Sequence, residues 1–232
     1  NIYQSYYEVI LGANAVIDYL PNVIDTEENI NKVKAQAYAL RGFYYFNLVN
    51  IFGTPYNSDS TALGVPLKLQ SGIEPIDDYL KRKTVAEVYA QILSDFHTAE
   101  ATYLELPESE QWSDNYRTSL PMVQLMLSRT YLYMERWEEA ARYAKMVMDD
   151  KRFKLVDLND VQLEEPNSDG QYVRTYSNMP TYKCSETIWP YGNVTDMFKW
   201  AYDYANTTSS ISGQKMHAYF QASQSLLDSY LD

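Results

Sequence analysis

Apolar residues recur every three or four positions through most of the first 150 residues, which is the spacing of one face of an α-helix. In the first such stretch the stripe consists of Ile2, Tyr6, Val9, Ala13, Val16 and Leu20. Sequence signals mark where these stretches begin and end, among them Pro21 after the first and the capping box Thr84-Val-Ala-Glu87 before the third. The pattern predicts helices over residues 2–20, about 25–52, 84–104, about 118–134, about 136–150 and 223–231.

Three segments lack a sustained period. Residues 54–83 contain three prolines and predict a long ordered connector, a length that in compact domains is often functional or packed against the body. Residues 106–116 predict a polar loop. Residues 151–222 are rich in Ser, Asn, Thr and Tyr and predict loops, with one or two short strands near 186–191. The fold class that follows is mainly α, built from antiparallel helical hairpins and ending in a loop-rich final third.

The fourth and fifth predicted helices match the tetratricopeptide pattern, in which small residues let two helices approach and aromatic rings fill the groove between them. The matching positions are Leu127, Ser128, Tyr131, Trp137, Ala140, Ala144 and Val147. The proline that usually closes this repeat is absent. The earlier helices do not match the pattern. That they also form repeats is inferred only from the way successive helices would pair.

The second predicted helix is apolar on two faces. One stripe is Val33, Ala37, Leu40, Tyr44, Leu48 and Ile51, and the other is Tyr38, Gly42, Tyr45, Val49 and Phe52. A helix of this kind lies between two neighbours, as in a helical solenoid. Gly42 would allow a close approach of a neighbouring backbone, and Arg41 is expected to stack on rings in a structural role. Gly53 is expected to end the helix with a left-handed backbone.

The composition narrows the function classes. The chain of 232 residues has a formal net charge of −12, which argues against nucleic-acid binding because phosphates are bound by clustered Lys and Arg. The same charge argues against docking on anionic lipid through a basic patch. No run of about 18 apolar residues occurs, so no segment is predicted to span a bilayer. The 23 tyrosines suggest many half-buried positions, because an apolar ring carries a polar hydroxyl.

The sequence shows no residue pattern typical of catalysis or metal binding. His97 and His217 are far apart and lack metal-ligand spacing to Asp, Glu or Cys. Cys184, the only cysteine, has no nearby histidine to activate it. The nucleophile-elbow, phosphate-loop and dinucleotide-binding motifs do not occur. The sequence therefore predicts a non-catalytic protein without a metal or cofactor.

The stretch AQAYALRGFYYFNLVNIFGTPY, residues 35–56, resembles the signature of the SusD/RagB family of outer-membrane glycan-binding lipoproteins from Bacteroidetes. The matching positions are Ala35, Ala37, Leu40, Arg41, Tyr45, Phe46, Leu48, Val49, Phe52 and Gly53. Gly42 stands where alanine is commoner in the family, which is a mild departure. Other blocks agree in order: GVPLKL at 64–69, residues 82–104, the repeat helices at 127–149 and SETIWPY at 185–191.

The resemblance implies a tetratricopeptide-like scaffold that binds oligosaccharide or polysaccharide and passes it to a SusC-like TonB-dependent transporter. It also implies a surface-exposed place at the outer membrane, through a lipid anchor absent from this chain. Family members are commonly much longer. The chain is therefore expected to be a single incomplete SusD-like domain over 1–232, with a helical scaffold over about 2–150 and an irregular ligand-side segment over about 151–232.

Sugars present flat apolar faces ringed by hydroxyls, so a site for them needs aromatic rings beside amide, carboxylate or guanidinium groups. Two stretches outside the predicted core helices offer this combination. The expected ligand-binding residues are Trp200, Tyr202, Asp203, Tyr204 and Asn206 in the first stretch, 195–208, and Trp112 and Tyr116 in the second, 110–117. For each ring the alternative is that it closes a loop onto the core.

The sequence is also compatible with a second function. The repeat-like segment 124–152 and the acidic charge also suit a helical-repeat scaffold that binds a protein or peptide. Sugar binding and peptide binding are therefore the two expectations to be weighed.

Overall fold

The computed structural model describes residues 2–72, 81–112, 117–155 and 185–189. The chain divides into two compact units, Asn1–Trp189 and Pro190–Asp232, and every described residue lies in the first. The helix expected at 223–231 and most of the loop-rich segment 151–222 therefore lie outside the described residues. Residues 185–189 form no strand, and the rest of the expected strand segment is likewise outside them.

The long helices agree with the sequence pattern, and the mainly α fold class is confirmed. They are α1 (Ile2–Tyr19), α2 (Glu27–Phe52), α3 (Val85–Leu104), α5 (Leu120–Tyr133) and α6 (Trp137–Asp149). Two short helices were not expected: the 3₁₀ turn η1 (Leu20–Asn22), which contains Pro21, and α4 (Glu108–Gln111) within the polar loop. The connector contains two strands, β1 (Leu63–Pro66) and β2 (Arg82–Thr84), paired antiparallel.

Side-chain caps explain where three helices begin. Thr84 and Glu87 form the expected capping box at the start of α3. The hydroxyl of Ser119 accepts a hydrogen bond from the Met122 amide at the start of α5, and Thr26 caps α2 in the same way. Each hydroxyl satisfies one of the amide groups that a helix leaves without a partner in its first turn.

The expectation of a left-handed backbone at Gly53 is wrong. Gly53 has φ −106° and ψ 172°, an extended conformation that any residue can adopt. Glycine is needed there for a different reason: a Cβ atom at this position would lie 2.6 Å from the carbonyl oxygen of Val49. At the end of α2 the backbone of Gly53 therefore lies too close to the last turn of the helix to leave room for a side chain.

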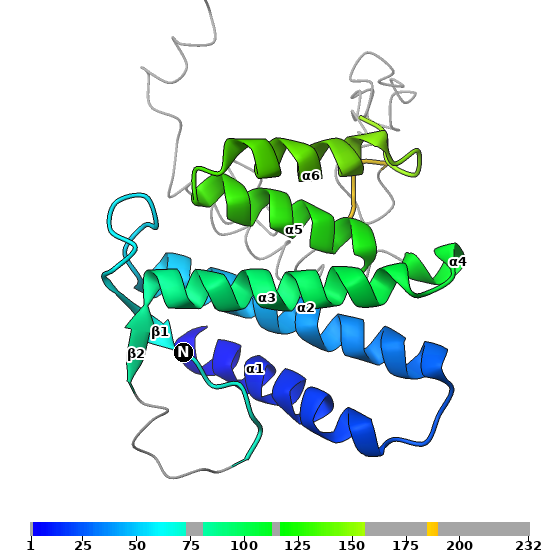
Figure 1. Cartoon of the computed structure of the whole chain (residues 1–232), viewed down its shortest axis with the longest axis horizontal. Coiled ribbons are helices and arrows are strands. Elements are labelled where there is room, and N and C mark those ends of the chain that lie inside the picture. Colours follow the sequence, from blue (N-terminus) through cyan, green and yellow to red (C-terminus); the bar gives the residue numbers. More distant parts are fainter. Residues whose placement is uncertain (1, 73–80, 113–116, 156–184, 190–232) are drawn as a thin grey trace, which may run out of the picture. The chain divides into compact units, whose positions relative to one another are not determined.

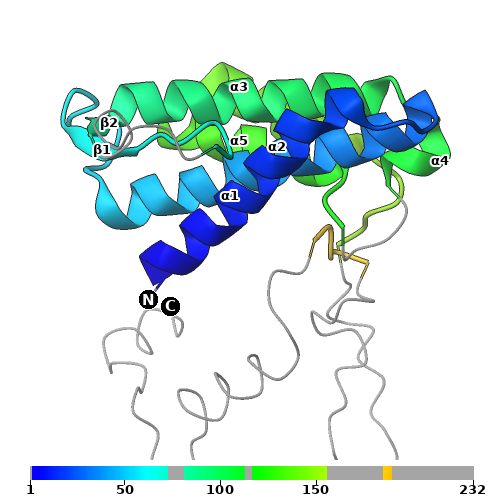
Figure 2. The ribbon, with the colours of Figure 1, turned by 90° about the horizontal axis from the view of Figure 1, so that it is seen from below.

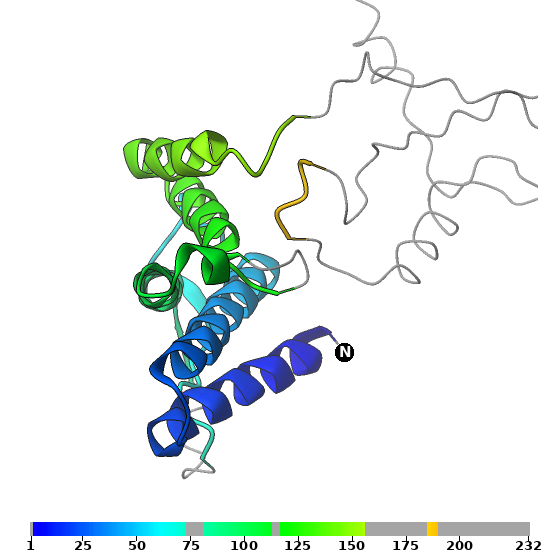
Figure 3. The same cartoon turned by 90° about the vertical axis from the view of Figure 1, so that its right-hand side faces the viewer.

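The helices stack side by side in the order α1, α2, α3, α5 and α6, each packed against the next (Figure 1). Figure 3 shows the same stack from the side. In Figure 2 the short strands β1 and β2 lie at one end of the paired helices α2 and α3. None of the helices among the described residues is long and apolar enough to cross a membrane.

The helix α2 lies between α1 and α3, as its two apolar faces predict. Gly42 allows the close approach to α3, because a Cβ there would meet the Phe96 ring at 3.0 Å. Two details differ from the expected stripes. In α1 the buried positions are Ile10, Ala13 and Asn14, so the face is rotated from the stripe read off the sequence. Trp137 is 60% exposed and fills no groove.

Candidate functional site

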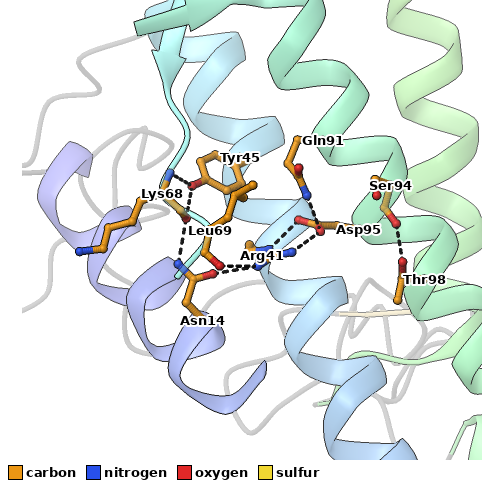
Figure 4. Close-up of polar contacts among 9 residues, drawn as sticks. All are labelled: Asn14, Arg41, Tyr45, Lys68, Leu69, Gln91, Ser94, Asp95 and Thr98. Atoms are coloured by element: carbon orange, nitrogen blue, oxygen red, sulfur yellow. Dashed lines mark hydrogen bonds and ion pairs between the residues drawn. The ribbon is translucent and has the colours of Figure 1, made fainter. Parts of the chain in front are cut away.

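Arg41 lies at the centre of a buried polar network between three helices (Figure 4). Its Nε donates to Asp95 Oδ2 at 2.9 Å and its Nη2 to Asp95 Oδ1 at 2.6 Å. Its Nη1 donates to Asn14 Oδ1 at 2.9 Å, and its guanidinium lies 5.1 Å from the centre of the Tyr38 ring. Burial raises the pKa of the Asp95 carboxyl, while the hydrogen bonds from Arg41 and Gln91 oppose that rise.

The same network fastens the connector to the helices. Asn14 Nδ2 donates to the Lys68 carbonyl at 2.8 Å. The Tyr45 hydroxyl donates to that carbonyl at 2.7 Å and accepts from the Lys68 amide at 2.8 Å. Arg41 Nη1 also reaches the Leu69 carbonyl at 3.4 Å. The polar groups of Arg41, Asn14 and Tyr45 all form hydrogen bonds within the protein. Arg41 therefore has the structural role expected of it, and it holds the connector in place.

Asp95 is the partner that the sequence analysis missed. A signal for it exists, because this acid lies on the apolar face of α3 beside the buried Ile92 and Phe96. An unpaired charge on such a face is costly, so an acid there implies a buried cation opposite it. The stacking of Arg41 on a ring was correctly expected, but it is secondary to the ion pair.

A second cluster of polar and aromatic side chains lies at the surface beside α4. We call it the Trp112 surface; it consists of Trp112, Asp150, Arg152, Phe153, Lys154 and Ser185. The Trp112 ring is half-buried, with the Phe153 ring edge-on to it at 6.0 Å between centres. The Arg152 guanidinium lies 5.7 Å from the centre of the indole. Trp112 Nε1 is buried and has no acceptor within the described part of the chain.

Arg152 is held by Asp150. Its Nε donates to Asp150 Oδ1 at 2.9 Å and to Oδ2 at 3.0 Å, and its Nη2 donates to Oδ2 at 2.6 Å. Burial acts to raise the pKa of the Asp150 carboxyl, but the hydrogen bonds and charge of Arg152 outweigh it and lower that pKa. Arg152 Nη1 makes no hydrogen bond to any of the residues that the structure describes. The guanidinium is therefore fixed in place by Nε and Nη2, and its Nη1 donors are not used by any described residue.

Two hydrogen bonds tie this surface to the segment 185–189. The Lys154 amide donates to the Ser185 carbonyl at 3.0 Å, and Ser185 Oγ donates to the Lys154 carbonyl at 2.9 Å. Farther along the segment, the Trp189 ring packs edge-on against Phe43 of α2 at 4.9 Å. Figures 1 and 3 show this segment in orange beside the stacked helices. The segment 185–189 is thus held at Ser185 by Lys154 and at Trp189 by Phe43.

Of the predicted ligand-binding residues, the structure describes Trp112 alone. The others lie outside the described residues: Tyr116, Trp200, Tyr202, Asp203, Tyr204 and Asn206. What the sequence did not show is that Asp150, Arg152 and Phe153 join Trp112. These residues follow α6 and lie some forty positions downstream, so only the folded helices bring them together.

His97 tethers three helices to one another. Its Nε2 lies 2.8 Å from the Tyr131 hydroxyl of α5, and its Nδ1 lies 3.4 Å from Glu100 Oε2. Tyr143 of α6 donates to the same Glu100 oxygen at 2.9 Å. The histidine is therefore part of the packing between α3, α5 and α6. Within the described ranges, no group of three or more His, Cys, Asp or Glu side chains is placed to hold a metal ion.

A groove of about 580 Å³ lies beside the turn between α1 and α2. Its lining combines aliphatic side chains with one aromatic ring and several polar groups. The aliphatic residues include Val16, Leu20 and Val33, the ring is that of Tyr19, and the polar residues are Asp25, Asn29, Lys32, Gln36 and Arg117. The aliphatic part of this lining suits apolar side chains, and Tyr19 is the single ring among the lining residues. The groove is thus a different kind of site from the Trp112 surface.

Comparison with known proteins identifies the architecture. Residues 1–132 match a SusD-like family model described as starch-binding and associating with the outer membrane. The SusD-like protein P38 of Formosa agariphila is 26% identical over 156 residues, which are 66% of this chain and 27% of that protein. The chain thus spans about a quarter of the length of this curated relative.

Solved structures agree with the family match. A SusD-like carbohydrate-binding protein from Bacteroides vulgatus superimposes with a TM-score of 0.70 at 25% identity, covering 90% of this chain and 40% of that one. A laminarin-binding SusD-like protein gives a TM-score of 0.54 at 26% identity, covering 67% of this chain and 32% of that one. The resemblance read from residues 35–56 is therefore confirmed: the chain belongs to the SusD-like family.

Proposed function

We propose that the protein captures glycans at the cell surface without catalysis and passes them to a SusC-like TonB-dependent transporter. The observation that carries the proposal is the family match over residues 1–132, which includes the signature helix α2. The carbohydrate-binding and laminarin-binding relatives support a sugar as the cargo. Surface exposure at the outer membrane, through a lipid anchor, belongs to the same proposal.

The Trp112 surface supports sugar binding on chemical grounds. It offers an indole ring, a fixed guanidinium and a carboxylate within one small area. Sugar sites combine an apolar ring for the C–H face with hydrogen-bonding groups for the hydroxyls. In this proposal the ligand-binding residues are Trp112 and Tyr116 in the stretch 110–117, and Trp200, Tyr202, Asp203, Tyr204 and Asn206 in the stretch 195–208.

The domain organisation is part of the proposal. The chain is taken as one SusD-like domain over 1–232, with the helical scaffold over about 2–150 and the ligand-side segment over about 151–232. The buried network around Arg41 makes the scaffold rigid, and rigid elements position ligand-binding loops most accurately.

Calorimetric titration of the 232-residue chain with neutral and charged polysaccharides tests the function. Binding to at least one glycan class is expected. Trp200→Ala is expected to weaken that binding while leaving the thermal midpoint nearly unchanged. A fall in stability of about 3–5 kcal/mol, typical of truncating a buried aromatic ring, would instead place Trp200 in the core. Binding to peptides and to no glycan would contradict the sugar cargo.

The groove beside the turn between α1 and α2 favours a second candidate, a scaffold that binds a peptide or protein. Its aliphatic walls would accept apolar side chains. Val33→Asp would place a charge in this groove at an exposed position. Peptide binding that this variant abolishes, with glycan binding absent from both proteins, would support the scaffold function over glycan capture.

A further inference from the structure

We propose that the Trp112 surface selects glycans that carry carboxylate or sulfate groups. The inference rests on the proposed glycan-binding function and names the class of sugar that this surface would take. Three observations carry it: the local balance of charge, the fixed orientation of Arg152, and the aromatic ring beside it.

The short stretch that carries Arg152 is basic, although the whole chain is acidic. The sequence holds 31 acidic and 19 basic residues, yet residues 151–154 read Lys-Arg-Phe-Lys. The two preceding acids each have a basic partner, because Asp149 pairs with Lys145 and Asp150 with Arg152.

Two positive charges therefore remain. Lys151 and Lys154 are exposed, and neither forms an ion pair with any described residue. Glu186, next to Ser185, is exposed and adds one negative charge near this surface. At physiological salt the screening length is about 8 Å, so only charges close to a bound group act on it strongly.

Arg152 is oriented before any ligand arrives. Asp150 accepts hydrogen bonds from its Nε and Nη2, which fixes the plane of the guanidinium. The Nη1 donors face no described acceptor. A planar guanidinium binds a carboxylate or sulfate through two parallel hydrogen bonds, and holding it in place beforehand reduces the entropy lost on binding.

The ring distinguishes this surface from an ordinary solvated group of lysines. Trp112 lies next to Arg152 and is itself positioned by Phe153. An acidic pyranose has an apolar C–H face and a charged substituent at its edge. The indole suits the first feature and the Arg152 guanidinium, with Lys154 two residues on, suits the second.

Calorimetry on the 232-residue chain tests the inference with three probes: chondroitin, which carries uronate alone, chondroitin sulfate, which carries both groups, and neutral laminarin. We expect at least one of the two anionic polymers to bind more tightly than laminarin. Raising the salt from about 0.15 to about 0.5 M should weaken anionic binding several-fold, because ion contacts are screened. The two anionic probes separate carboxylate from sulfate as the group recognised.

Matched variants locate the effect. Arg152→Gln should weaken binding of the preferred anionic polymer roughly tenfold, since a charge-assisted hydrogen-bond pair is lost. Lys154→Gln should weaken it less, and Arg129→Gln, which removes the same charge from an exposed position on α5, should not change it. If Arg152→Gln does not fold, a Lys151→Gln and Lys154→Gln pair replaces it.

The failures can be told apart. Laminarin binding as tightly as the anionic polymers, without dependence on salt, would overturn the selectivity and leave glycan capture standing. An effect of Arg129→Gln equal to that of Arg152→Gln would show that only total charge matters and would also overturn it. Binding of none of the three glycans would count against glycan capture as well.

Discussion

Arg41 and Arg152 make nearly the same contacts in two different parts of the molecule. Each guanidinium is bound by one aspartate through two nitrogens, Asp95 for Arg41 and Asp150 for Arg152. Each also lies near an aromatic ring, at 5.1 Å and 5.7 Å from its centre. The Arg41 side chain is 6% exposed and the Arg152 side chain 33%.

The difference lies in the donors that remain. All three nitrogens of Arg41 donate to the protein's own oxygens, including the Leu69 carbonyl of the connector. Arg152 keeps Nη1 without a partner among the described residues. The same pair of residue types thus stabilises a scaffold where it is buried and fully bonded, and in the proposed site it leaves donors for a ligand where it is half-exposed.

The largest expected effect is the loss of Arg41. Arg41→Ala leaves the Asp95 carboxylate buried without its cation, which costs about 3–5 kcal/mol of the free energy of unfolding. Urea denaturation followed by circular dichroism measures it. The double variant Arg41→Met, Asp95→Leu removes both charges and should recover much of the loss, because the penalty comes from the unpaired charge. If Arg41→Ala were as stable as the wild type, Arg41 would contribute no more to stability than Arg152 is expected to.

A glycine pair tests how closely the scaffold region is packed. Gly53→Ala would place a Cβ 2.6 Å from the Val49 carbonyl oxygen and should destabilise the protein by about 1–3 kcal/mol. Gly12→Ala on α1 is the control, since a Cβ there meets nothing within 4 Å. It should stabilise by roughly 0.5–1 kcal/mol, because alanine favours a helix over glycine. Equal thermal midpoints for the two variants would argue against the close approach at Gly53.

The Trp112 surface should contribute little to stability. Arg152→Gln removes an ion pair that is partly open to water, so the free energy of unfolding should fall by less than about 1 kcal/mol. Thermal denaturation measured beside the Arg41 variant gives the contrast. A loss as large as that of Arg41→Ala would show that Arg152 is a second scaffold residue.

The smallest effect is expected in acid. The pKa of Asp150 is lowered in the folded protein, so its contribution to stability is present above the unfolded pKa of about 3.9 and is lost as the pH falls through the folded value. Asp150→Asn should therefore be slightly less stable than the wild type at neutral pH. The difference should shrink and vanish as the pH falls through the lowered folded pKa, and a difference that persists in stronger acid would argue against the ion pair as its source.

The scaffold was largely predictable from the sequence, because local signals define it. Helical periodicity and the capping box at Thr84 indicate the helix positions, and the two apolar faces of α2 place it between neighbours. The rotated face of α1 was not predictable, because Asn14 is buried by hydrogen bonds to Arg41 and Lys68 rather than by apolar contact.

The candidate site was predictable only in part. Trp112 was chosen because a ring stands among polar residues in a short stretch. Asp150, Arg152 and Ser185 could not be joined to it, since no local pattern links residues that tertiary packing brings together. Asp95 is an intermediate case: its place on an apolar face signalled a buried partner, and the identity of that partner required the structure.

The most direct test of the two roles measures stability and glycan binding on the same two variants, Arg41→Gln and Arg152→Gln. Arg41→Gln should lower the urea midpoint strongly, while its folded fraction binds the glycan with nearly unchanged affinity. Arg152→Gln should leave the midpoint nearly unchanged and weaken binding of an anionic glycan. Loss of both properties in both variants, or unchanged binding by Arg152→Gln, would contradict it.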